Sequence, residues 1–260
     1  MLTFLKLGGS LITDKRGEQA YRAEIMARTA AEIAQVYTPE HPLLIGHGSG
    51  SFGHVVAQKY GTARGVRTAA EWRGFAEVSL VARRLNSLIL EALSAVGLPM
   101  LGFQPSASAR CADGKLISLE SELIGRALAH GLVPLVHGDV AFDVVRGGTI
   151  LSTEAIFFYL AEHLQPARIL LLGETEGVYD VDGQVIPRIT PQNFPRVAAA
   201  LGRSSGTDVT GGMAAKVEAM LALIERVPGL QVQIMGGAAA GQIAAALRGD
   251  VELGTRLAAQ

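Results

Sequence analysis

Residues 46–54 read GHGSGSFGH, so four glycines, two serines and two histidines fall within nine positions. A plain connection between two elements needs only about two to six residues of ordinary turn composition. A glycine-rich loop between a strand and a helix directs backbone N–H groups at a phosphate. We therefore predict a phosphate-binding loop here. Taken alone, either histidine fits a structural role better, although His54 is expected where the chain enters a helix and could face the bound anion.

A second candidate is the stretch KLGGS at 6–10, at the end of an apolar run. Its two glycines allow a tight turn that brings N–H groups against an anion. Lys6 adds a positive charge, Ser10 adds a hydroxyl donor, and Lys15 follows in the same loop. The GxxxxGK[ST] spacing is missing, so this is not a Walker A motif. Read alone, the stretch fits an ordinary strand-to-helix turn equally well.

A third candidate is DVTGGMAAK at 208–216, where a Gly-Gly turn opens a predicted helix. Lys216 lies one turn inside that helix, and a helix N-terminus plus a lysine suits the β- and γ-phosphates of a nucleotide. Asp208 could accept hydrogen bonds from Lys6 or Lys216. The alternative for Lys216 is a solvated helix lysine. Positive groups converging on phosphates, with no evident nucleophile, are typical of phosphoryl transfer.

The elements that position these turns follow from short apolar runs, each followed by glycine, at 2–7, 42–46, 132–137, 168–172 and 231–235. Such runs, apolar on both faces, indicate parallel strands covered by helices. Helical periodicity is expected over 74–96, 212–226 and 239–248. The predicted fold is α/β, an open and mostly parallel sheet sandwiched by helices. Its candidate residues lie at carboxyl ends of strands, where such sheets bind ligands.

We expect one compact unit with an N-terminal acceptor lobe at 1–165 and a C-terminal nucleotide-binding lobe at 166–260. The segment 173–210 is rich in turn formers and is expected to build short strands and loops.

Composition narrows the function classes. The chain has 260 residues, of which 49% are hydrophobic and 18% charged, and its net charge is −1. A balanced charge argues against nucleic-acid binding. The single cysteine, Cys111, is expected to be a buried small hydrophobe. Neither a signal peptide nor a membrane span is predicted, so we expect a cytoplasmic protein.

Five segments resemble the amino acid kinase family in order and spacing: KLGGS at 6–10, HGSGSFGH at 47–54, GD at 138–139, EGVYD at 176–180 and DVTGGMAAK at 208–216. The resemblance covers nearly the whole chain. It implies the fold of that family, ATP and Mg²⁺ as cofactors, and a homodimer. SFGH followed by VVAQKYG, together with DVTGGM, is similar to the branch that converts isopentenyl phosphate to isopentenyl diphosphate in isoprenoid biosynthesis.

The resemblance also implies roles for individual residues. Those expected at the ATP phosphates are Lys6, Gly8, Gly9, Ser10, Gly50, Gly212 and Lys216, and those bordering the adenosine lie between Glu174 and Tyr179. Those expected around the acceptor phosphate are Ser49, Gly50, His54 and Thr153. The catalytic group is expected to be Lys6, Lys15, Lys216 and His54, with Asp139 and Asp208 as orienting residues. No residue is expected to be a metal ligand.

Three positions depart from the family pattern. The family usually has SGDD where this chain has STEA at 152–155, and TDVDGVY where it has GETEGVY at 173–179. Ser49 replaces a glycine. Two other functions stay open: a kinase of another small acid, such as a phosphonate (fosfomycin), a carbamate or an amino acid, and a non-catalytic nucleotide sensor. His54 favours a phosphate or phosphonate acceptor, and the three lysines argue against a sensor.

Overall fold

The computed structural model describes residues 1–14, 16–201, 212–250 and 253–259. Its main sheet has eight strands in the order β10-β12-β11-β9-β1-β2-β6-β3. In chain order these are β1 (Thr3–Leu7), β2 (Leu43–His47), β3 (Met100–Gly102), β6 (Val133–His137), β9 (Arg168–Gly173), β10 (Arg188–Ile189), β11 (Gln231–Gly236) and β12 (Thr255–Leu257). Neighbouring strands pair in parallel except β11 with β12, so the predicted open, mostly parallel sheet is confirmed.

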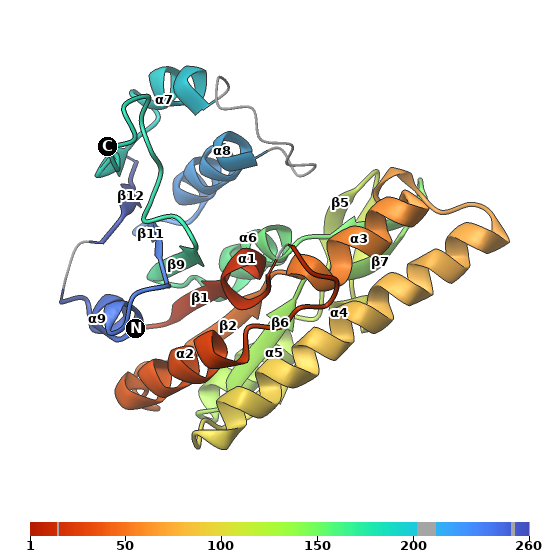
Figure 1. Cartoon of the computed structure of the whole chain (residues 1–260), viewed down its shortest axis with the longest axis horizontal. Coiled ribbons are helices and arrows are strands. Elements are labelled where there is room, and N and C mark those ends of the chain that lie inside the picture. Colours follow the sequence, from red (N-terminus) through yellow and green to blue (C-terminus); the bar gives the residue numbers. More distant parts are fainter. Residues whose placement is uncertain (15, 202–211, 251–252, 260) are drawn as a thin grey trace.

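Helices cover both faces of this sheet (Figure 1). They are α1 (Gly9–Ile12), α2 (Ala23–Val36), α3 (Gly50–Tyr60), α4 (Ala69–Ala95), α5 (Glu122–Ala129), α6 (Thr153–Leu164), α7 (Phe194–Leu201), α8 (Gly212–Arg226) and α9 (Gln242–Arg248), with short 3₁₀ turns η1 (Thr62–Arg64) and η2 (Pro105–Ala107). None of the described helices is long and apolar enough to cross a membrane.

The alternation of side chains along β1 divides the core into two layers. Phe4 packs with the cluster that contains α6 and α8, and its ring meets Phe157 edge-on at a centroid distance of 5.1 Å. Leu5 and Leu7 point to the opposite face, into the cluster built with α2 and α4. Lys6 therefore faces α6. This alternation decides which carboxylate the lysine can reach.

Two parts of the fold differ from the sequence prediction. The helix expected at 74–96 begins earlier, at Ala69, because Thr68 and Glu71 form a capping box. A second sheet, in the order β5-β4-β7-β8, was not predicted. Its strands are β4 (Arg110–Ala112), β5 (Lys115–Ser118), β7 (Asp139–Asp143) and β8 (Gly147–Leu151). Of these, β4 and β5, with three and four residues, are too short to carry a detectable alternation.

The boundary predicted near residue 165 falls in the connection between α6 and β9. The main sheet contains strands from both sides of this boundary, because β9 pairs with β1. The carboxylate of Glu32 on α2 links the two sides, because it accepts hydrogen bonds from the N–H groups of Gly241, Ile243 and Ala244 at the start of α9. The division into an acceptor lobe and a nucleotide lobe stays a prediction.

Asp143, 4% exposed, holds the two hairpins of the small sheet together. Its carboxylate accepts hydrogen bonds from the N–H groups of Asp113, Gly114, Val145 and Arg146, at 3.1, 2.7, 2.8 and 2.8 Å. Burial alone would raise the pKa of this carboxyl, but the four donors outweigh it and hold the pKa below its usual range. The charged form therefore stabilises the sheet.

We predict that Asp143→Asn destabilises the fold by about 2 to 3 kcal/mol at neutral pH, because an amide group then meets N–H donors. Because the pKa of Asp143 is lower in the folded than in the unfolded state, its carboxylate stabilises the fold fully at a pH above the ordinary Asp pKa. This stabilisation is lost as the pH falls through the pKa of the folded state. Urea unfolding should thus show the gap between wild type and variant narrowing in acid. Asp113→Asn, which only breaks a surface pair with Arg146, is the control; an equal loss in both variants would contradict this role.

Candidate active site

Two glycine turns at the carboxyl edge of the sheet lie in backbone contact. A Cβ on Gly9, after β1, would clash with the backbone nitrogen of Gly50, after β2, and one on Gly48 would lie 3.0 Å from the nitrogen of Gly9. Gly50 also has a φ of +48°, which disfavours any side chain. The sequence-predicted Gly8–Ser10 and Ser49–Gly50 turns therefore form one continuous surface.

The first N–H groups of a helix have no partner within it. At the start of α3 the N–H of Ser51 is bonded to Thr13 Oγ1, and those of Phe52 and Gly53 are bonded to Ser49 O, which leaves the N–H of Gly50 for an anion. Thr13 fixes this helix against the first turn, since its hydroxyl donates to Gly9 O at 2.7 Å and accepts from Ser51 N at 2.9 Å. The sequence analysis did not single out Thr13.

Glu154, at the start of α6, joins Lys6 and Lys216, two of the three lysines predicted to be catalytic. Its Oε1 lies 3.1 Å from Lys6 Nζ and 3.7 Å from Lys216 Nζ. Lys6 is 6% exposed and comes from the middle strand of the sheet, while Lys216 comes from the second turn of α8. The structure thus brings together two lysines that are 210 positions apart in the sequence.

Charge balance explains the state of this carboxylate. Burial would raise the pKa of Glu154, but Lys6 and Lys216 outweigh that effect and hold the pKa below its usual range. Glu154 is therefore ionised at neutral pH and forms an ion pair with each of the two lysines.

The segment STEA at 152–155 lacks the two aspartates that are usual in the family. In the structure the Ser152 hydroxyl caps α6 by accepting a hydrogen bond from Ala155 N at 3.1 Å. Glu154 supplies a carboxylate that pairs with Lys6. The hydroxyl of Thr153 donates a hydrogen bond to His47 O at 2.6 Å, so the donor that Thr153 can still offer to a ligand is its backbone N–H at the start of the helix. Thr153 lies 1% exposed beside the turn after β2.

The remaining predicted residues lie in different places. Asp139 accepts hydrogen bonds from Ser106 N and Val140 N and, within the described residues, forms no ion pair with a lysine. Glu174, after β9, pairs with Arg22 at 2.8 Å, and Tyr179 OH accepts from Glu176 N at 3.2 Å. His54 lies one turn inside α3 rather than at its entry, and is exposed. Lys15 and Asp208 lie outside the described residues.

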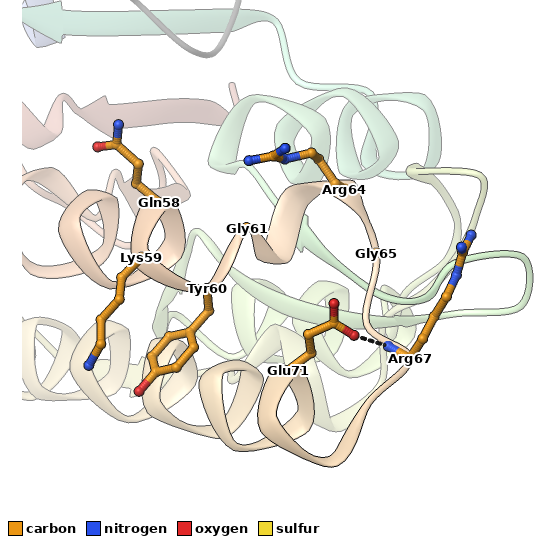
Figure 2. Close-up of a pocket in the computed structure, with 8 residues that line it drawn as sticks. All are labelled: Gln58, Lys59, Tyr60, Gly61, Arg64, Gly65, Arg67 and Glu71. Carbon is orange, nitrogen blue, oxygen red and sulfur yellow. Dashed lines mark hydrogen bonds between the residues drawn. The ribbon is translucent and has the colours of Figure 1, made fainter.

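A basic hollow of about 320 Å³ lies at the opposite end of α3 (Figure 2). It includes Lys59, Arg64 and Arg67, but these side chains point in different directions and do not converge on one point. Glu71 at its floor accepts the backbone N–H of Arg67 at 2.7 Å. Lys6 and Lys216, which share a carboxylate, do not line this hollow.

Within the described ranges, no group of three His, Cys, Asp or Glu residues is arranged to hold a metal ion.

The geometry defines a phosphotransferase site, with lysines and backbone donors gathered at the carboxyl edge of an open α/β sheet. Residues 1–236 match the amino acid kinase family, and the chain belongs to that family.

Several relatives are similar over most of their length. The isopentenyl phosphate kinase of Methanocaldococcus jannaschii is 34% identical over 97% of both chains. That of Haloferax volcanii is 40% identical over 85% of this chain and 88% of its own. A solved isopentenyl phosphate kinase superposes with a TM-score of 0.84 at 30% identity, covering 99% of this chain and all of the other.

We predict that Glu154→Gln leaves the fold intact and lowers kcat by about 10- to 100-fold, because the two lysines then repel each other and lose their common anchor. Steady-state kinetics on the purified variant measure this. Glu162→Gln is the matched control, since Glu162 lies on the same helix and pairs at the surface with Arg226 at 3.0 Å.

A double variant separates positioning from general damage. Lys216→Ala alone should lower turnover by about 100- to 1,000-fold, as expected for removing one preorganised charge. Adding Glu154→Gln to it should cost less than the same change in wild type, since one lysine has already gone. Additive losses would show that Glu154 does not act through Lys216.

Proposed function

We infer that this chain is an ATP-dependent kinase that transfers the γ-phosphoryl group of ATP to isopentenyl phosphate and releases isopentenyl diphosphate and ADP. The observation that carries this reading is the Lys6–Glu154–Lys216 cluster facing two glycine turns in contact. The similarity to isopentenyl phosphate kinases over nearly the whole chain supports the choice of acceptor.

The chemistry requires alignment and positive charge more than a nucleophile built into the protein. The acceptor phosphate is itself the nucleophile, and the transferring group passes through a loose, negatively charged transition state. We assign the ATP phosphates to Lys6, the Gly8–Ser10 turn and the start of α8 with Lys216. The bond from the attacking oxygen to γ-phosphorus forms as the bond to the β,γ-bridging oxygen breaks, and the electron pair leaves with ADP.

Mg²⁺ is part of the proposal. This ion binds one or two carboxylates together with substrate phosphates and keeps several waters. We therefore expect it to arrive with ATP and to neutralise charge between the β- and γ-phosphates. Lys6 and Lys216 add the charge that the protein supplies, and Glu154 keeps both side chains in place.

The acceptor is proposed to lie at the start of α3, with its phosphate on Ser49, Gly50 and His54 and its alkyl chain toward α4. The α4 helix packs against α3 and carries Phe75 and Val78 on its buried face. A groove of about 390 Å³ between α4 and β7 is lined in part by Phe75, Leu80, Val140 and Phe142. These side chains offer an apolar wall suited to a small alkyl group.

We also propose that the protein works as a homodimer.

An acceptor panel tests the substrate. We expect ATP-dependent ADP release with isopentenyl phosphate and dimethylallyl phosphate, weaker activity with longer prenyl phosphates, and little with fosfomycin, carbamate or glutamate. Phe75→Ala should relax the length limit gradually, since each methylene contributes only about 1 to 3 kcal/mol. Activity on fosfomycin or glutamate alone would keep the fold and overturn the acceptor. ATP binding without any turnover would indicate a nucleotide sensor.

His54 is expected to act on the acceptor and not on ATP. Losing a hydrogen bond to a charged phosphate costs about 1.5 to 3 kcal/mol, which corresponds to about 10- to 150-fold in kcat/KM for the acceptor. His54→Ala should show this loss with the KM for ATP nearly unchanged, and His54→Gln, which keeps a donor, should recover part of it. The reverse pattern would exchange the two phosphate sites.

A further inference from the structure

His47, the last residue of β2, is buried directly beneath the phosphate loop. Its side chain is 1% exposed, and both ring nitrogens lie near polar atoms. Nδ1 lies 3.1 Å from the carbonyl oxygen of Gly48, and Nε2 lies 3.1 Å from the side-chain Oδ1 of Asn86 on α4. His137, the last residue of β6, stacks on this ring at 5.4 Å with the planes 6° apart.

The ring of His47 is neutral. Burial lowers its pKa to about 3, and the neighbouring His137 and Lys6 further disfavour a positive charge there. A neutral imidazole has one N–H and one acceptor nitrogen, yet both neighbouring atoms are oxygens. If the proton were on Nε2, the lone pair of Nδ1 would face the lone pairs of the Gly48 carbonyl.

The conflict resolves in one way. The carbonyl of Gly48 can only accept, whereas the amide of Asn86 can turn by half a rotation and present its NH₂ group. The proton then lies on Nδ1 and bonds to Gly48 O, and Asn86 Nδ2 donates to Nε2. The Gly48 carbonyl thereby selects the tautomer of His47, and Asn86, 8% exposed in α4, satisfies the remaining nitrogen.

The hydrogen bond from His47 Nδ1–H to Gly48 O completes the set of bonds that hold the loop between β2 and α3. The preceding carbonyl, that of His47, already accepts the hydroxyl of Thr153 at 2.6 Å and the N–H of Gly138 at 3.2 Å. The N–H of Gly48 donates to Leu7 O at 3.0 Å. With two successive carbonyls held on the protein side, the peptide planes after them are fixed, and so is the direction of the N–H group of Ser49, the residue directly before α3.

We propose that His47 and Asn86 are positioning residues for the acceptor phosphate, acting through the Nδ1–H bond to the Gly48 carbonyl. The proposal rests on the proposed function for its kinetic test, because it assigns the acceptor to this loop. It requires no contact between His47 and substrate.

Two substitutions of His47 test the proposal, because an asparagine amide nitrogen can take the place of Nδ1 and a glutamine nitrogen the place of Nε2. His47→Asn should keep the KM for isopentenyl phosphate within about threefold of wild type, and His47→Gln should raise it about tenfold, the effect of one lost hydrogen bond. The KM for ATP should change by less than about twofold in both. Equal loss in the two variants, or an equal rise in the KM for ATP, would overturn the proposal.

His137 provides the matched control. It is equally buried and lies in the same stack, and its ring nitrogens have no hydrogen-bond partner in the part of the chain that the structure describes. Its Asn and Gln variants should affect acceptor KM alike, although both should lower the melting temperature. A difference between them as large as that between the His47 variants would show a packing effect instead of a specific bond.

The tautomer can be read without any substrate. Nitrogen and carbon chemical shifts of the wild-type imidazoles should show Nδ1–H for His47 at neutral pH, and Asn86→Leu should keep this tautomer, because the Gly48 carbonyl still accepts from Nδ1. An Nε2–H tautomer or an imidazolium in wild type would overturn the proposal. If wild type proved inactive on isopentenyl phosphate while the Nδ1–H tautomer was present, the acceptor assignment would fail and the loop anchor would stand.

Discussion

The shared carboxylate of Glu154 is the interaction on which the rest of the site depends. In the proposed assignment, the ammonium groups of Lys6 and Lys216 both reach the phosphates of one nucleotide, and without a counter-charge they would repel each other. A carboxylate within 3.1 and 3.7 Å of them removes that repulsion in the empty protein. The site is then assembled before ATP binds, so binding energy is not consumed in bringing the lysines together.

This constraint explains the layout of the surrounding fold. Lys6 can reach α6 only because it alternates with Leu5 and Leu7 and so points to the α6 face. The turn after β1 must then lie flat against the turn after β2, which leaves no room for a Cβ at Gly9. Thr13, Thr153 and Ser152 fix the turns and the helix start around that contact.

The glycine turns were accessible from the sequence because their composition has few structural explanations, and the strands because apolar runs ended at those glycines. Glu154 was not, because nothing local marks which of many carboxylates meets a lysine 148 positions earlier. The only local feature that marks Glu154 in the sequence is its place in the first turn of a helix, two residues after the capping residue Ser152. The early start of α4 was readable from Thr68 and Glu71, a capping box that the sequence analysis passed over.

The central place of β1 has a consequence for how the chain is made. One of its edges pairs with β2, which ends at His47, 40 positions after the end of β1. Its other partner, β9, ends only at Gly173, so during synthesis the second edge stays open long after the first can pair. An unpaired apolar strand is a template for association with other chains. Until β9 is in place, an intermediate in which β1 pairs only with β2 therefore exposes an edge at which other chains can associate.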